Sequence, residues 1–206
     1  FMGAGPEVHG YTEWGSRTPE LPSRVIVKNN IFPTIFQIYR DANPKAEIGV
    51  LSEWAGIQFL VDTLSTDYHA VAPDYNKFPT ALCEMAEKYI KENKPSLVAI
   101  CFDNPDHVGH KEGHDTPAYY SKLEELDGYI ARIVAAVKEA GMYDDTIFII
   151  TSDHGGIKKG HGGKTMAEMQ TPFIIAGKNI KKAGEFQESM VQYDVAATMA
   201  YIFGLE

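Results

Sequence analysis

Hydrophobic residues follow two recurring patterns along this chain. Short, nearly continuous apolar runs, which are typical of buried strands, occur at residues 47–52, 97–102, 146–151 and 173–176. Apolar residues at three- and four-residue spacing predict helices over residues 31–42, 57–64, 79–92, 116–141 and 194–203. Strands and helices therefore alternate, which favours an α/β layered fold with a largely parallel sheet.

The clearest of these segments is the helix that the pattern predicts over residues 116–141. Thr116 is a typical N-cap, and Pro117 takes the first helical position, where its missing N–H costs nothing. Residues 1–30, in contrast, are rich in Gly, Pro and polar side chains and are predicted to be loop. No internal repeat or linker is evident, and we expect residues 1–206 to form a single α/β domain.

The composition limits the classes of protein to which the chain can belong. A length of 206 residues is enough for a full core, and 44% hydrophobic and 23% charged residues are ordinary for a globular protein. A formal net charge of −9 leaves no basic stripe for phosphates, so we expect no nucleic acid polymer as a partner. Two cysteines exclude a disulfide framework, and no run approaches the roughly 18 apolar residues of a membrane span.

Two short polar clusters stand out because each directly follows an apolar run. Residues 106–110 read Asp-His-Val-Gly-His, and residues 152–156 read Ser-Asp-His-Gly-Gly, with His161 seven residues after His154. Five of the seven histidines lie between positions 107 and 161. Because ligands of open α/β sheets gather beyond the carboxyl ends of the strands, we expect both clusters at the same sheet edge.

The residue types in these clusters suit a two-metal centre. Carboxylates and imidazoles are the groups that hold zinc or manganese. Asp106 and His110 can reach one ion, Asp153 and His154 can converge on a second, and His161 can return to either. Two ions about 4 Å apart could clamp the attacking and leaving oxygens of a phosphoryl group and lower the pKa of bound water.

Each of these matches also has a purely structural explanation when taken alone. A single Asp-x-x-x-His or Asp-His match is common, since Asp often caps a turn, whereas three matches in order at strand ends favour a metal site. His107 and His114 are further imidazoles near the first cluster, and His114 fits a cap of the following loop better than a ligand. Lys158, Lys159 and Lys164 fit a solvated loop better than an anion site.

The order Asp106-x-x-x-His110, then Asp153-His154, then His161, resembles the alkaline phosphatase superfamily, closest to its type I phosphodiesterase/nucleotide pyrophosphatase branch. Residues 104–110 are also similar to the cofactor-independent phosphoglycerate mutases of that superfamily. Residues 171–177 and 193–198 resemble its last core strand and closing helix. The resemblance covers residues 6 to 205 and implies a three-layer α/β/α fold with a largely parallel central sheet.

The resemblance implies how the ligands are divided between the metals. Asp106, His110 and His161 would hold one ion and Asp153 and His154 the other, with zinc as the first choice and manganese as the alternative. In the family, the second ion also binds an aspartate after the first strand and a Ser or Thr nucleophile that forms a covalent phospho-enzyme. The implied activity is hydrolysis of a small phosphorylated substrate by a phosphatase or phosphodiesterase, in a bacterial protein that is periplasmic or secreted.

The first residues depart from the family pattern. Residues 3–10 resemble the segment that shortly follows the nucleophile, so we expect the first strand, its aspartate and the nucleophile to precede Phe1. We therefore expect little turnover from the 206-residue chain alone. Where the phosphodiesterase branch has a phosphate-contacting Asn, four residues after Gly10, this chain has Trp14, a candidate aromatic platform for substrate.

Three other functions compete with the hydrolase hypothesis. A phosphomutase of the same superfamily is disfavoured by the short spacing of His154 and His161 and by the lack of a recognisable sugar-phosphate site. A sulfatase is disfavoured because those enzymes use a calcium site richer in carboxylates and amides. A non-catalytic metal-binding protein would keep the fold and the ligands while lacking the nucleophile, and fold alone does not separate it from an enzyme.

Overall fold

The computed structural model describes residues 1–13, 15–27, 29–185 and 187–205, which divide into two compact units. The first unit consists of residues 1–72, 95–101 and 188–206, and the second of residues 73–94 and 102–187. Both polar clusters belong to the second unit. The arrangement within that unit therefore determines the geometry of the candidate site.

The first unit is built on a parallel sheet of three strands in the order β2 (Tyr68–Val71), β1 (Ile48–Ser52) and β3 (Leu97–Cys101). All five residues of β1 are buried, as expected for the central strand of a parallel sheet. The predicted strands at 47–52 and 97–102 are thus confirmed. β2 has no matching signal in the apolar pattern, because its side chains are half-buried or exposed.

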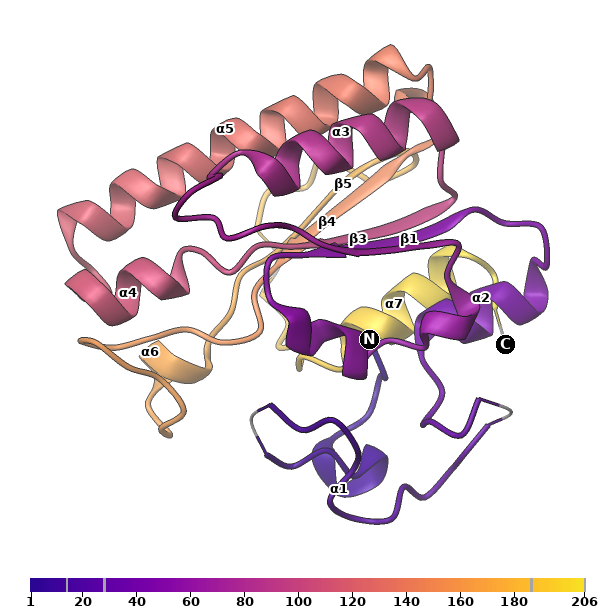
Figure 1. Cartoon of the computed structure of the whole chain (residues 1–206), viewed down its shortest axis with the longest axis horizontal. Coiled ribbons are helices and arrows are strands. Elements are labelled where there is room, and N and C mark those ends of the chain that lie inside the picture. The colour runs from indigo at the N-terminus through magenta and orange to yellow at the C-terminus, as the bar shows by residue number, and fades with distance from the viewer. Residues whose placement is uncertain (14, 28, 186, 206) are drawn as a thin grey trace. The chain divides into compact units, whose positions relative to one another are not determined.

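The helices of the first unit are α1 (Pro6–His9), α2 (Ile35–Ala42) and α7 (Asp194–Ile202). α2 begins after Thr34, whose hydroxyl accepts a hydrogen bond from the Gln37 N–H at 3.3 Å. α2 lies beside α7 (Figure 1). The core of the unit consists of Ile35, Phe36, Tyr39, Ile48, Val50, Val61, Leu97 and Ala196.

The helix predicted over residues 57–64 is wrong. The structure has two short 3₁₀ turns in this region, η1 (Ala55–Phe59) and η2 (Thr63–Ser65). The Asp62 carboxylate accepts a hydrogen bond from the Leu64 N–H at 3.1 Å and so starts a new turn instead of continuing a helix. Leu64 is 78% exposed, so the helical spacing of apolar residues does not correspond to a buried face.

The second unit combines a pair of helices with a pair of strands (Figure 1). The long helices α3 and α5 lie side by side, and β4 pairs with β5. The predictions of helices at 79–92 and 116–141 and of strands at 146–151 and 173–176 are confirmed. The elements are α3 (Ala81–Asn93), α4 (Asp106–Glu112), α5 (Pro117–Glu139), η3 (Tyr143–Asp145), β4 (Ile147–Thr151), α6 (Met166–Met169) and β5 (Phe173–Gly177).

The strand directions follow from the connections between the strands. β4 and β5 run antiparallel, with Ile149 opposite Ile175. Parallel neighbours need a crossover that is usually a helix, whereas the segment between β4 and β5 contains only the one-turn helix α6. The chain therefore has the predicted mixed α/β fold, with three parallel strands in the first unit and an antiparallel pair in the second.

The segment after β3 is a helix, where the sequence predicts a metal-binding loop. α4 contains seven residues, and Gly109 lies at its centre, where glycine weakens a helix. The Gly109 position is nevertheless buried, and the helix ends at Gly113, whose φ of 106° is unfavourable for other residues. The helix matters for the site because it aligns residues 106 and 110.

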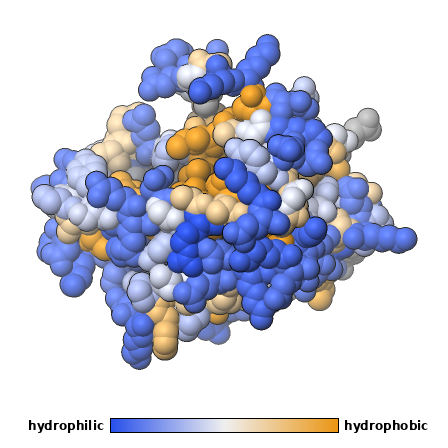
Figure 2. All heavy atoms as spheres, turned by 90° about the horizontal axis from the view of Figure 1, so that it is seen from above, coloured by the Kyte–Doolittle hydropathy of each residue, from blue (hydrophilic) through white to orange (hydrophobic). Residues whose placement is uncertain are grey.

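Figure 2 shows a largely hydrophilic face on which hydrophobic residues gather in one region. In the ranges that the structure describes, no helix combines the length and apolar character needed to cross a membrane.

Candidate metal centre

Helix α4 supplies the first two side chains of the site. Asp106 is its first residue and His110 lies one turn later, so both project from the same helix face. The His110 Nε2 atom lies 3.2 Å from Asp106 Oδ2. The Asp-x-x-x-His spacing in the sequence therefore corresponds to one helical turn.

The segment after β4 supplies the other residues, and it is closed on itself by hydrogen bonds. The Gly155 N–H donates to the Glu168 carbonyl at 2.8 Å. The Glu168 carboxylate accepts from the Gly163 N–H at 2.9 Å and from the Thr165 hydroxyl at 2.6 Å. It also accepts from the Thr165 N–H at 3.3 Å, the bond that Glu168 contributes to a capping box at the start of α6. These bonds hold His161 in a short loop that returns toward α4.

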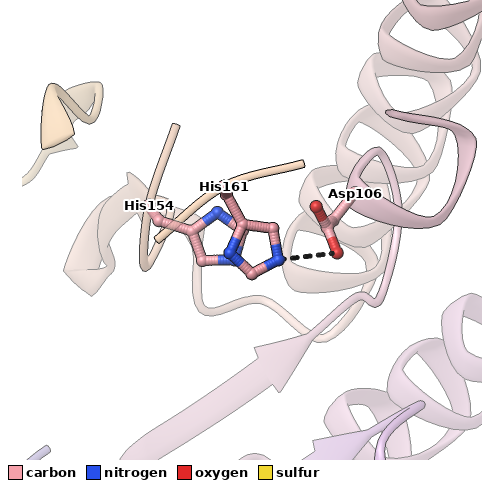
Figure 3. Close-up of side chains that lie close together, drawn as sticks. All are labelled: Asp106, His154 and His161. Atoms are coloured by element: carbon pink, nitrogen blue, oxygen red, sulfur yellow. Dashed lines mark ion pairs between the residues drawn. The ribbon is translucent and has the colours of Figure 1, made fainter. Parts of the chain in front are cut away.

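The loop and the helix bring three predicted ligands together. His161 Nε2 lies 3.1 Å from His110 Nε2 and 3.7 Å from Asp106 Oδ2. With the 3.2 Å separation inside α4, the three ligand atoms are all within 3.7 Å of one another. Figure 3 shows His161 directed at the Asp106 carboxylate from the opposite side of the site.

His154 joins this cluster. Its ring stacks on that of His161, with centroids 3.8 Å apart and an interplanar angle of 18° (Figure 3). Ligand atoms of Asp106, His154 and His161 lie within 4.8 Å of one another. The imidazole that was expected to serve a separate second ion therefore lies beside the first ligand set.

Asp153 lies at the edge of the site. Its side chain is 86% exposed, and its Oδ2 atom is 3.6 Å from His154 Nε2. The structure thus brings Asp153 next to His154, as the sequence suggested, but leaves it in solvent. The other predicted residue, Trp14, lies outside the described residues.

Backbone carbonyls determine which ring nitrogen of His110 and of His154 faces the site. His110 Nδ1 lies 3.0 Å from the Lys159 carbonyl, and His154 Nδ1 lies 2.8 Å from the Gly155 carbonyl. A carbonyl oxygen only accepts hydrogen bonds, so each Nδ1 carries the proton, and the Nε2 lone pair of the neutral ring is left for a ligand bond. This arrangement of a carbonyl behind the imidazole is the usual support of metal-binding histidines.

The electrostatics of the site also favour a neutral imidazole at His161. Burial, followed by the neighbouring His154, lowers the pKa of His161 below its ordinary value of 6.5, although Asp106 opposes the shift. Imidazole must be neutral to bind a metal. Asp106 Oδ1 is buried and accepts no hydrogen bond from the described residues, so the carboxylate has unused coordinating capacity.

The donor set therefore fits a divalent transition metal. One carboxylate and two or three imidazoles are a common ligand set for zinc and are also acceptable to manganese. The ligands come from two segments that are about fifty residues apart, and the loop hydrogen bonds hold them in place before any ion binds. Such a centre can polarise a phosphoryl oxygen and activate a bound oxygen nucleophile.

Sequence reasoning missed the residues that support the ligands. Glu168 gave no signal beyond a Thr-x-x-Glu capping box at 165–168, which a search for helix starts would have found. The carbonyls of Lys158 and Lys159, which hold histidine rings, have no sequence signature because every residue carries a carbonyl. His114, interpreted as a loop cap, is instead 9% exposed and adjoins Asp106.

A family model for type I phosphodiesterase / nucleotide pyrophosphatase matches residues 6–183 of the chain. The catalytic subunit of human GPI ethanolamine phosphate transferase 2 is 28% identical over 138 residues, which cover 64% of this chain and 14% of that protein. The 2,3-bisphosphoglycerate-independent phosphoglycerate mutase of Vibrio vulnificus (strain YJ016) is 31% identical over 165 residues, or 77% of this chain and 30% of the mutase. The chain thus spans less than a third of either relative.

A solved structure gives the corresponding comparison of folds. The crystal structure of Ps i-CgsB matches with a TM-score of 0.68 and 17% sequence identity, over 100% of this chain and 60% of that chain. At this identity the likeness concerns the fold alone. The match extends over both units of the chain.

Proposed function

The chain belongs to the type I phosphodiesterase / nucleotide pyrophosphatase family of the alkaline phosphatase superfamily, and from this premise we propose that it is the metal-binding part of a phosphoryl-transferring enzyme. The proposed reaction is hydrolysis of a phosphoric ester in a small substrate. The observation that carries the proposal is the convergence of Asp106, His110 and His161, whose ligand atoms lie within 3.7 Å of one another.

Each residue has a distinct part in this proposal. Asp106, His110 and His161 hold the first divalent ion, with zinc preferred over manganese. His154 and Asp153 contribute to a second ion, with Asp153 drawn in from its exposed position. Bound ions would supply Lewis-acid stabilisation of charge on the phosphoryl oxygens.

The charge of the chain supports a role for cations at the site. At −9 the protein repels an anionic substrate, and a local positive charge is needed to reverse that field. Lys159, on the loop that holds His161, donates from Nζ to the Lys111 carbonyl at 2.7 Å, so its ammonium group joins the loop to α4. We therefore assign Lys159 a structural role, in which it holds the loop against α4, and not a direct contact with substrate.

The second candidate function is transfer of the phosphoryl group to a hydroxyl group in place of water. Two relatives have names that denote transfer to an acceptor other than water, an ethanolamine phosphate transferase and a phosphoglycerate mutase. Transfer and hydrolysis share the metal centre and differ in the group that takes the phosphoryl moiety. The hydrolase proposal and the transferase alternative therefore predict the same ligands.

The proposal is tested by binding of inorganic phosphate, a product-like anion, to the zinc-loaded chain by isothermal titration calorimetry. We expect phosphate to bind only with zinc present, and EDTA to abolish the heat. Asp106→Asn, which keeps the size of the side chain and removes its charge, should lose phosphate binding. Asp74→Asn is the matched control, because Asp74 caps an exposed turn through Asn76.

Zinc-independent phosphate binding would overturn the proposal, as would binding that persists in Asp106→Asn. Zinc binding without phosphate binding would instead favour the non-catalytic metal-binding protein.

A further inference from the structure

His114 occupies a central position beside the metal centre without belonging to the predicted ligand set. Its side chain is 6% exposed, and its ring lies 5.2 Å from that of Tyr119 at the start of α5. A Cβ atom on either Gly109 or Gly156 would overlap this ring. The ring is therefore enclosed between helix α4 and the loop after β4.

Hydrogen bonds attach His114 to that loop. Its backbone N–H donates to the Lys158 carbonyl at 2.6 Å, and its Nδ1 lies 3.0 Å from the same oxygen. Lys158 has a φ of 53°, a conformation that few non-glycine residues adopt. The double contact from His114 holds the loop at the turn that precedes His161.

The opposite edge of the ring faces the metal ligand on α4. His114 Nε2 lies 3.5 Å from Asp106 Oδ1, the buried carboxylate oxygen that accepts no hydrogen bond from the described residues. The other oxygen, Oδ2, is the one directed at His110 and His161. A group packed against Oδ1 limits rotation of the carboxylate and so determines where Oδ2 points.

We propose that His114 is a positioning residue, which fixes the Asp106 carboxylate relative to the His161 loop so that the ligands are preorganised for a divalent ion. The inference rests on the proposed metal centre and adds a residue that acts through Asp106 and not on the ion. Groups that orient metal ligands in this way typically change metal affinity by about 10- to 100-fold when replaced.

Two substitutions of His114 test the contacts at the two edges of its ring separately. His114→Gln is long enough to keep an amide group packed against Asp106 Oδ1, whereas His114→Asn can keep only the contact with the Lys158 carbonyl. His107→Asn is the matched control, since His107 is adjacent to Asp106 in sequence and its ring packs on Tyr75 at 4.9 Å. Zinc affinity is measured by competition with a chromophoric chelator, and the metal-free melting temperature of each variant is recorded.

We expect the Asn variant to bind zinc about 10-fold or more weakly, and the Gln variant to stay within about 3-fold of wild type, as for other groups that orient ligands. The control should be unchanged, and the two His114 variants should have similar metal-free melting temperatures. A cobalt-loaded Asn variant should also show an altered visible absorption spectrum, because the ligand geometry changes.

Unchanged zinc affinity in both variants would overturn the positioning role while leaving the metal centre intact. Equal losses of affinity that parallel equal losses of melting temperature would also overturn it, because they indicate packing alone. A wild-type chain that binds no zinc would refute the proposed function and this inference with it, so the two failures are distinguishable.

Discussion

The reactivity of the Cys83 thiol follows directly from its burial. The thiol on α3 is fully buried and lies 3.7 Å from the Tyr129 carbonyl. Burial raises the pKa of Cys83 to about 11. In a Cys101→Ala variant, we expect native Cys83 to react with iodoacetamide at pH 8 on the order of 100-fold more slowly than in urea, since only the thiolate reacts. Equal rates in folded and unfolded protein would contradict the structure.

Two helical glycines offer a matched pair of predictions. A methyl group on Gly128 of α5 would meet no neighbouring atom within 4 Å, whereas the same methyl on Gly109 of α4 would overlap the His114 ring. Gly128→Ala should raise the free energy of unfolding by about 0.5–1 kcal/mol, because alanine favours helix. Gly109→Ala should lower it by about 1–3 kcal/mol through overpacking. Urea denaturation measures both, and equal effects of the two substitutions would refute the packing of His114.

The pair of helices α3 and α5 is joined by a bidentate ion pair. Arg132 Nε and Nη2 donate to the two Glu87 carboxylate oxygens at 2.7 and 2.9 Å. Arg132 holds the pKa of Glu87 below its ordinary value of 4.5. Because the pKa is lower in the folded state, the stabilisation is complete above pH 4.5 and is lost as the pH falls through the folded-state value.

Glu87→Gln should therefore lower the free energy of unfolding by about 1 kcal/mol at pH 7, and the difference from wild type should shrink as the pH is lowered toward 3. Glu139→Gln is the control: its partner Lys91 also joins α3 to α5, at 3.5 Å, but Glu139 is 64% exposed. Urea titrations at several pH values give the result. A difference that stays constant with pH would refute the role of the ion pair.

The loop that holds His161 depends on the capping box at α6. Glu168→Ala removes the acceptor for the Gly163 N–H and the Thr165 hydroxyl. Loss of such a cap costs about 1 kcal/mol, so hydrogen exchange at 156–165 should accelerate roughly fivefold. Mass spectrometry after peptide digestion measures the rate, with the exposed Lys164→Ala as control. Unchanged exchange in Glu168→Ala would show that other contacts hold the loop.

At the scale of elements, the sequence pattern predicted most segments that bury a regular face. The helices at 81–93 and 117–139 and four of the five strands in the described residues follow from apolar periodicity and caps. The apolar pattern predicted the wrong element where local hydrogen bonds or tertiary contacts determine the backbone conformation. The Asp62 carboxylate, which accepts from the Leu64 N–H, starts a second 3₁₀ turn where the apolar spacing predicts one helix. Helix α4 forms despite its central glycine.

The candidate ligands could be named from the sequence because zinc and manganese favour carboxylate and imidazole, and these residue types follow strand ends here. Their grouping could not, since the loop from 155 to 170 folds back through backbone and capping bonds that the pattern does not encode. The result is a single cluster that includes His154, with Asp153 exposed beside it. Whether Asp153 joins a second ion stays a prediction.

At the scale of the whole molecule, an acidic chain carries a cluster of imidazoles and one carboxylate in its second unit. Metal binding would add positive charge where the side chains converge. It would also stabilise the folded state by an amount that grows with the logarithm of the ratio of free metal concentration to dissociation constant. The central claim is therefore that this chain binds a divalent metal through Asp106, His110 and His161.

That claim is tested most directly by the zinc and manganese content per chain, determined by elemental analysis after reconstitution and gel filtration. Wild type is compared with His110→Ala and His161→Ala, and with His9→Ala as a control in the first unit. We predict about one firmly bound ion per chain in wild type and in the control, and loss of that ion in both ligand variants. Metal retained in both ligand variants, or no metal in wild type, would contradict the account.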